Sequence, residues 1–229
     1  MKKSICFIFT ISIAMAAIAQ NEVKDPKAKE ILDELSEKTK SYKTIVSDFS
    51  FTMENQQEDI SESYDGKVRI KGNKYRLSLM DSEIYCDGKT IWTHIVESDE
   101  VNITNRDLED KTFLNNPQSI FTMYEEGYKY SYKGEIKEHT GSFSHIELYP
   151  EEVAQGLEPG DQEISDLSKI VIIVDTNLNR IRTFTYYTKN GNIYTINLNK
   201  FKVNIPIGDA DFTFDTAAYP DVEVIDLRD

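Results

Sequence analysis

The chain has 229 residues, and its 40 acidic side chains outnumber 26 Lys and Arg, giving a formal net charge of −14 at pH 7. Because nucleic acids and anionic membranes both reward basic surfaces, this acidity excludes nucleic acid as a partner and argues against binding to an anionic membrane surface. We interpret the negative charge as a source of solubility.

The first residues have the form of a secretory signal. Two lysines precede an apolar run at 5–18 that is too short to span a bilayer, and "AIA" before Gln20 is a small-x-small cleavage site. We therefore expect residues 1–19 to be a signal peptide and residues 20–229 to be one exported domain. Removing the signal takes away two lysines and no acidic residue, which makes the mature chain still more acidic.

Cysteine usage limits how the exported domain is held together. Of the two cysteines, Cys6 lies inside the signal, so the mature chain keeps only Cys86 and has no intramolecular disulfide. The fold must then rest on its own apolar core, for which its length is sufficient.

The mature chain opens with a predicted helix. Asp25 is a good N-cap, and Pro26 is favoured at the first helical position. Apolar residues then follow at spacings of three and four, which is typical of a helix with one buried stripe. The stripe comprises Ile31, Leu32, Leu35, Thr39 and Tyr42.

After Tyr42 the apolar period changes to two, which indicates strands. Gly72-Asn73 and Asp87-Gly88 provide tight turns, because both pairs accept positive φ. The alternating stretches are 45–53, 64–70, 75–79, 84–95, 101–103, 128–132, 143–149, 170–174, 181–187 and 193–203.

Two segments interrupt this series of strands. Residues 117–124 read as a short helix with Ile120, Phe121 and Tyr124 on one side. The acidic, Gly- and Pro-containing stretch 151–166 reads as an exposed loop. We expect one antiparallel sheet domain with a long N-terminal helix and a short helix in mid-chain.

The residue types that usually carry catalysis are sparse. His94, His139 and His145 are scattered without metal-ligand spacing, and no nucleophile or phosphate-binding motif is present. Cys86 alternates with Ile84, so a small buried hydrophobe is favoured over a reactive thiol. We expect no enzyme, no cofactor and no metal, and a hydrolase using His94 or Cys86 is the alternative.

The order of these pieces resembles the LolA family of periplasmic lipoprotein carriers, over nearly the whole mature chain. "SDFSFTMEN" resembles the first strand of the family, and "YDGKVRIKGNKYRLSL" its glycine-containing strand and the aromatic strand after it. "CDGKTIW" is similar to the S-D-G-K-T-L-W hairpin, which is the most specific match. "NPQSIF" lies where the family has a short lid helix, and "DFTFDTAAYPDVEVIDLR" resembles the closing segment.

The resemblance implies a mainly β fold: an unclosed, curved antiparallel half-barrel, with an N-terminal helix and a short lid helix covering an apolar cavity. It implies a monomer without a cofactor that binds acylated lipoproteins in the periplasm of a Gram-negative bacterium. The partners it implies are an inner-membrane lipoprotein-releasing transporter, which supplies the cargo, and an outer-membrane receptor, which accepts it.

The resemblance also assigns cavity and lid residues. Ordinary core packing is the alternative at each position, because alternating strands would also form a filled sandwich. The predicted lipid-binding residues are Phe49, Phe51, Met53, Val68, Ile70, Tyr75, Leu77, Leu79, Ile84, Ile120, Phe121 and Tyr124.

One position departs from the family pattern. Well-known carriers have an arginine followed by a proline at the end of the glycine strand, and this arginine bonds to the lid. Here Gly72 and Asn73 stand in its place, and Lys71 points to the other face of its strand. We expect the lid to be held differently, with Arg76 as one possibility. An envelope sensor or interaction module with the same half-barrel is the alternative function.

Overall fold

The computed structural model describes residues 24–108, 113–125, 127–151 and 166–228. The expected signal peptide and nearly all of the expected acidic loop lie outside these residues. Within them, a single α-helix, α1 (Pro26–Lys40), packs against one sheet of twelve strands. No helix in this part of the chain is long and apolar enough to cross a membrane.

Helix α1 begins where the sequence predicts. The side chain of Asp25 accepts hydrogen bonds from the backbone N–H groups of Lys27 (2.8 Å) and Ala28 (3.2 Å), and Pro26 occupies the first turn. The helix ends at Lys40, so Tyr42 lies beyond it and packs on the core from the following loop. The residues that α1 buries are Ala28, Leu32, Leu35 and Ser36.

The strands follow one another mostly as hairpins. Their spatial order is β12-β6-β5-β4-β3-β2-β1-β11-β10-β9-β8-β7, so the sheet is open between β12 and β7. The strands are β1 (Ile45–Asn55), β2 (Ile60–Lys71), β3 (Lys74–Leu79), β4 (Ser82–Cys86), β5 (Thr90–Ile95), β6 (Glu100–Asn105), β7 (Tyr128–Glu138), β8 (Gly141–Pro150), β9 (Leu167–Asp175), β10 (Arg180–Thr188), β11 (Ile193–Val203) and β12 (Glu223–Asp226).

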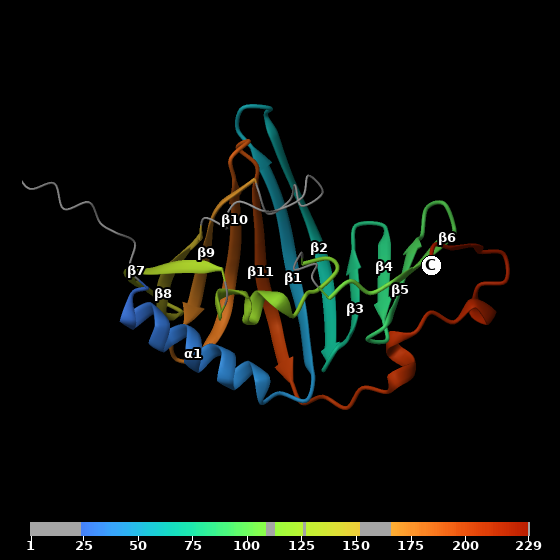
Figure 1. Ribbon diagram of the computed structural model, residues 1–229, viewed down its shortest axis with the longest axis horizontal. Coiled ribbons are helices and arrows are strands. Elements are labelled where there is room, and N and C mark those ends of the chain that lie inside the picture. Colours follow the sequence, from blue (N-terminus) through green and yellow to red (C-terminus); the bar gives the residue numbers. More distant parts are fainter. Residues whose placement is uncertain (1–23, 109–112, 126, 152–165, 229) are drawn as a thin grey trace, which may run out of the picture.

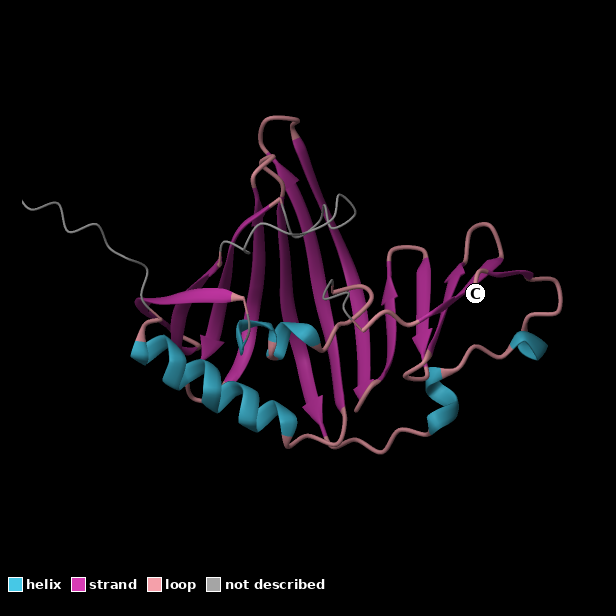
Figure 2. Ribbon diagram, viewed as in Figure 1, coloured by secondary structure: helices cyan, strands magenta, loops and turns pink. Residues whose placement is uncertain are grey.

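The sheet is strongly curved, and α1 and the mid-chain segment lie on its concave side (Figure 1). This arrangement confirms the predicted unclosed half-barrel with an N-terminal helix. The expected short lid helix consists of two 3₁₀ turns, η1 (Ser119–Phe121) and η2 (Met123–Glu125), coloured as helix in Figure 2. We call residues 113–125 the lid.

One strand departs from the expected antiparallel pattern. β12 runs parallel to β6, pairing Val224 with Val101, after the chain has crossed the convex face. We call residues 204–228 the C-terminal segment. It carries two further 3₁₀ turns, η3 (Asp209–Phe212) and η4 (Thr216–Ala218), and it covers a small apolar cluster. That cluster comprises Tyr85, Val101 and Phe214, with Trp92 and Val222 against it.

The two predicted turns are present. Gly72, at φ +55°, lies in the β2–β3 turn, and Gly88, at φ +100°, lies in the β4–β5 turn. Asp87 Oδ1 accepts from the backbone N–H groups of Lys89 and Thr90, each at 2.8 Å. "CDGK" is therefore a hairpin turn, as its Asp-Gly step predicts.

Candidate functional site

The concave face of the sheet holds the main apolar cluster of the molecule. Ten of the twelve predicted lipid-binding residues lie in this cluster, and each of them is 8% exposed or less. The other two, Phe51 and Met53, are half-buried, and Phe51 packs against the cluster. The ten are Phe49, Val68, Ile70, Tyr75, Leu77, Leu79, Ile84, Ile120, Phe121 and Tyr124.

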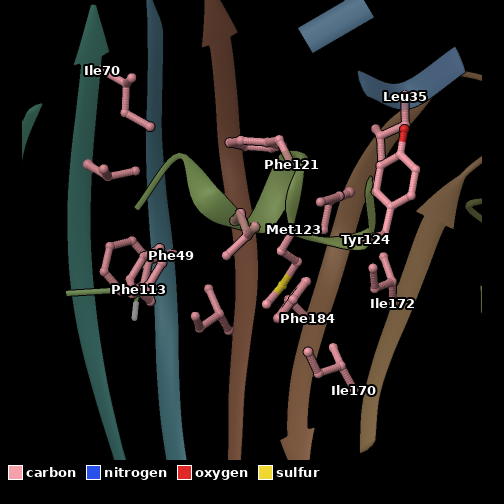
Figure 3. Packing of buried hydrophobic residues seen from close by; sticks show 14 of the residues in the cluster. Leu35, Phe49, Ile70, Phe113, Phe121, Met123, Tyr124, Ile170, Ile172 and Phe184 are labelled. Atoms are coloured by element: carbon pink, nitrogen blue, oxygen red, sulfur yellow. The ribbon is translucent and has the colours of Figure 1, made fainter. Parts of the chain in front are cut away.

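Several residues of this cluster were not among the predicted ones. They come from α1, from the lid and from the later strands, and their alternation with polar residues was the signal that could have identified those on strands. They include Leu32, Leu35, Phe113, Met123, Ile146, Leu148, Ile170, Ile172 and Phe184. Figure 3 shows the lid residue Met123 lying next to Phe184.

Strand register arranges the concave side chains in rows. The Phe184 row runs from β2 to β7 through Tyr64, Phe51, Ile196, Phe184, Ile172, Ile146 and Tyr132. The adjacent Tyr186 row runs from β1 to β7 through Met53, Tyr194, Tyr186, Ile170, Leu148 and Tyr130. The Phe184 row contains no charged side chain, and on β2 the Tyr186 row continues opposite Met53 with Glu62, to which the Tyr64 hydroxyl donates.

Burial changes along the Tyr186 row. Met53, Tyr194 and Tyr186 are only half-buried, whereas Ile170 and Leu148 are fully buried. The strands that carry the buried end, β7 to β9, lie on the side of the sheet that α1 spans (Figure 1). The apolar face is therefore accessible at its β1–β11–β10 end and closed at its β9–β8 end.

The lid fills the concavity with its own aromatic and aliphatic side chains. Phe113 meets Phe49 edge-on with ring centroids 5.3 Å apart, and Tyr124 meets Tyr130 at 6.5 Å. Phe121 packs on Phe201 at 6.5 Å. These contacts are apolar and non-directional, so another apolar group of similar size can replace them.

At its C-terminal end the lid is bound to α1 by polar contacts. Glu125 Oε1 accepts from Ser36 Oγ at 2.7 Å and from Lys40 Nζ at 2.5 Å. Burial acts to raise the pKa of Glu125, but these two hydrogen bonds outweigh it and hold the pKa below its usual range. The Tyr124 hydroxyl also faces Asp33 Oδ1 at 3.4 Å.

At its N-terminal end the lid is bound to the sheet by Arg106. Arg106 Nη1 donates to the carbonyl of Asn73 at 2.7 Å, and Nη2 donates to Asn116 Oδ1 at 3.2 Å. With the Gln118 amide nitrogen turned toward Gly72, that nitrogen donates to the Gly72 carbonyl at 2.5 Å. The Gln118 amide oxygen then accepts from Arg106 Nη2 at 3.1 Å. The β2–β3 turn is thus connected to the lid through its carbonyl groups.

Arg76 does not hold the lid, so that possibility is wrong. Its Nε donates to Glu83 Oε2 at 3.1 Å, and its guanidinium lies 4.6 Å from the ring centre of Tyr85. The reason is strand alternation: Tyr75 and Leu77 face the interior, so Arg76 between them faces outward. Lys71 also points outward, as expected, and donates to Ile207 O and Asp209 of the C-terminal segment.

Cys86 and His94 occupy separate, buried environments. Cys86 is fully buried in the concave cluster, and burial raises the pKa of its thiol. His94 lies on the convex side and contacts the rings of Phe214 and Tyr219, with Nε2 3.4 Å from Asp99 Oδ1. Cys86 is therefore a small buried hydrophobe, and the two side chains belong to different clusters.

Among the residues that the structure describes, no group of three or more His, Cys, Asp or Glu side chains could hold a metal ion. A cavity of about 380 Å³ lies on the convex side of β2 and β3, and its lining includes Lys67, Arg69, Arg76 and Glu83. Arg69 and Arg76 each pair with a carboxylate there, with Asp211 and Glu83 respectively. This hollow is polar and separate from the apolar interior.

Comparison with known proteins identifies the family. Residues 18–142, more than half of the chain, match the family described as outer membrane lipoprotein carrier protein LolA. The chain belongs to this LolA-like family. No curated protein sequence matches it.

Two solved structures are similar to this chain at low sequence identity, and the one with the TM-score above 0.5 shares its fold. An uncharacterized conserved protein from Thermus thermophilus is 14% identical, with a TM-score of 0.52, over 87% of this chain and 99% of that one. The lipoprotein LppX from Mycobacterium tuberculosis is 12% identical, with a TM-score of 0.49, over 80% of this chain and 98% of that one. At these identities the likeness concerns the fold alone.

Proposed function

We propose that the protein binds the acyl chains of lipoproteins on its concave face and carries them between membranes. The observation that carries this proposal is the apolar half-barrel interior, which is covered by a short separate lid whose ends are held by polar contacts. Membership of the LolA-like family supports the same function. The proposal includes neither an enzymatic activity nor a cofactor.

Binding would exchange one set of apolar contacts for another. An acyl chain that enters at the half-exposed strands would displace the lid side chains Phe113, Phe121 and Met123 from the concave face. Burying apolar area stabilises either state by about 25 cal/mol per Å². Loading and release can then be nearly balanced, which suits a carrier.

The proposed route includes export. Removal of residues 1–19 would release a monomeric carrier into the periplasm of a Gram-negative bacterium. An inner-membrane lipoprotein-releasing transporter would supply the cargo, and an outer-membrane receptor would accept it. These partners follow from the family resemblance.

Native mass spectrometry of protein purified from the periplasm, before and after lipid extraction, tests the proposal. We expect a co-purified lipoprotein or an added mass that matches acyl chains. A mass equal to that of the bare chain, together with no uptake of a fluorescent acyl probe, would contradict the carrier function. It would favour the alternative of an envelope sensor or interaction module.

A pair of neighbouring substitutions sharpens the test. Phe51→Glu places a carboxylate on the half-exposed concave face, whereas Thr52→Glu places one on the opposite face of the same strand. We expect Phe51→Glu to weaken acyl-probe binding at least about tenfold, because the charge must be desolvated beside the chain. Thr52→Glu should bind the probe like the wild type. Equal binding by both variants would remove the concave face as the site.

A further inference from the structure

The hydroxyl group of Tyr186 is buried inside the apolar concavity without a hydrogen-bond partner among the described residues. The residue as a whole is half-buried, and its ring packs against Phe184, with centroids 4.8 Å apart. Buried polar groups in folded proteins nearly always have a partner, so each exception calls for an explanation.

Other concave tyrosines contrast with Tyr186. The hydroxyl of Tyr64, in the adjacent row, donates to Glu62 Oε2 at 2.7 Å, and the hydroxyl of Tyr124, on the lid, contacts Asp33. The side chains beside Tyr186 in its row, Tyr194 and Ile170, give its hydroxyl no bond. Burial, with the nearby Tyr128 phenol, raises the pKa of Tyr186. The group therefore stays protonated and is available as a donor.

Tyr186 also lies at an informative place in its row. Met53 and Tyr194 on one side of it are only half-buried, whereas Ile170 and Leu148 on the other side are fully buried. A chain that enters from the exposed end must pass Tyr186 before it reaches the buried end. The donor is thus positioned at the boundary between the accessible and closed parts of the concave face.

We propose that the Tyr186 hydroxyl donates a hydrogen bond to the carbonyl oxygen of an acyl ester or amide, and so fixes the depth of the bound chain. This inference rests on the proposed function. The carbonyl is the polar atom that an acyl chain carries next to its hydrocarbon. A free carboxylate fits less well, because neither the Tyr186 row nor the Phe184 row offers a cation to compensate it.

A matched pair of lipids tests this inference. 1-Palmitoyl-lysophosphatidylcholine and its 1-O-hexadecyl ether analogue have equal chains and headgroups, and the ether lacks the carbonyl. Competition of each against bound N-phenyl-1-naphthylamine gives their relative affinities for lipid-extracted protein. A hydrogen bond to an otherwise unsatisfied buried donor changes affinity about tenfold, so wild-type protein should prefer the ester by about that factor.

Tyr186→Phe should abolish the preference by weakening ester binding and leaving ether binding unchanged. Tyr64→Phe is the control, since it removes a hydroxyl that is already bonded to Glu62. It should keep the preference. If Tyr186→Phe keeps the preference for the ester, the proposed hydrogen bond is overturned. It is also overturned if wild-type protein binds both lipids equally. Both results leave the carrier function standing. Failure of wild-type protein to bind either lipid would contradict the proposed function itself.

Unfolding of lipid-free protein provides a second readout. Removing a hydroxyl that has no partner should leave the melting temperature of Tyr186→Phe unchanged or raise it. A clear decrease would show that the hydroxyl already has a partner in the free protein, and would overturn the inference. A loss of ester and ether binding alike would also overturn it, because that result indicates a packing role for the side chain.

Discussion

Gly66 of β2 lies directly beneath the ring of Phe49 on β1, with which it pairs across the sheet. A Cβ atom at this glycine would stand 2.3 Å from Phe49 Cζ and 2.6 Å from Cε2. Phe49 is 1% exposed and also packs on Phe113 of the lid, so it has little room to move. The glycine therefore lets an aromatic ring lie flat on the concave sheet.

We expect Gly66→Ala to destabilise the protein by about 1–3 kcal/mol, because the methyl group overpacks the core against Phe49. Urea unfolding followed by tyrosine and tryptophan fluorescence measures the change. Gly208→Ala is the matched control, since the nearest atom to its added Cβ, Asp211 Oδ2, is 3.8 Å away. An unchanged midpoint in Gly66→Ala would show that the Phe49 ring moves aside at little cost.

Glu147 of β8 is a nearly buried carboxylate surrounded by donors on the convex side. Lys169 Nζ donates to it at 2.8 Å, Lys133 Nζ lies 3.2 Å away, and the Tyr149 hydroxyl also donates to it. Burial acts to raise the pKa of Glu147, but these hydrogen bonds outweigh it and lower the pKa from 4.5 to about 2. The carboxylate is therefore more acidic in the folded than in the unfolded chain.

A lowered pKa stabilises the fold above the unfolded value, and this stabilisation is lost as pH falls from about 4.5 toward 2. We expect Glu147→Gln to lose about 2–3 kcal/mol at pH 7. The difference in unfolding free energy between Glu147→Gln and the wild type should shrink as the pH falls from about 4.5 toward 2. Urea unfolding at several pH values measures it. Glu138→Gln, which removes an exposed ion pair with Arg182, should have little effect at any pH. A difference in unfolding free energy that does not change with pH would contradict the lowered pKa of Glu147.

At the scale of elements, the sequence predicted what depends on local pattern. Asp25-Pro26 marked the start of α1, and Asp87-Gly88 and Gly72 marked hairpin turns, because caps and turns depend on a few adjacent residues. Alternation grouped the residues of β1 to β4 by face, and the family resemblance assigned which face is concave. The parallel pairing of β12 with β6 was missed, because partners far apart in the chain leave no local periodicity.

The polar contacts of the lid were missed for the same reason. Arg106 is separated by 33 residues from Asn73, whose carbonyl it binds, and Ser36 by 89 residues from Glu125. Nothing in the local pattern of these residues indicates their partners. Arg76, the candidate considered from the sequence, lies on the strand after the β2–β3 turn but faces the wrong side of the sheet.

The Arg106 contacts predict how the lid opens. Replacing Arg106 with Gln removes a charged donor to the Asn73 carbonyl, and hydrogen bonds to charged groups contribute about 1.5–3 kcal/mol. We expect the open lid to become roughly 10–100 times more populated. Amide hydrogen exchange measures this at Phe121 and Thr122, whose N–H groups bond within the lid turns.

Strand amides report whether the effect of Arg106→Gln is local. Exchange in β9 should stay as in the wild type, since β9 lies between β8 and β10, far along the sheet from the β2–β3 turn that Arg106 binds. Arg76→Gln is the matched control, because it removes an arginine from the opposite face of the sheet. Equal exchange in wild-type protein and Arg106→Gln would show that packing alone holds the lid closed.

At the scale of the whole molecule, the two faces of the sheet are covered in different ways. The concave face is covered by α1 and by the lid, which polar contacts hold at two points. The convex face of β2 to β6 is crossed by the C-terminal segment, through Lys71–Asp209 and Arg69–Asp211 ion pairs and the packing of Phe214 on Tyr85. The segment then ends as a strand on the edge of β6.

This last pairing covers the edge of β6. Glu223 N donates to the Asp99 carbonyl at 2.9 Å, and Leu227 N donates to the Ile103 carbonyl at 2.8 Å. A chain that ends at Asp221 would leave β6 as an unpaired edge with the apolar residues Val101 and Ile103, and such edges recruit other strands. We expect this truncated protein to dimerise or aggregate, as measured by size-exclusion chromatography with light scattering.

A chain that ends at Leu227 is the control, because it keeps both edge hydrogen bonds, and we expect it and the full chain to be monomeric. A monomeric protein ending at Asp221 with an unchanged unfolding midpoint would show that β12 does not protect the edge. The distinction bears on the proposed function, since a carrier would have to meet successive partners without pairing with copies of itself. With β12 in place the outermost strand is a four-residue one that begins with Glu223 and ends with Asp226, and short, charged edges resist pairing with other chains.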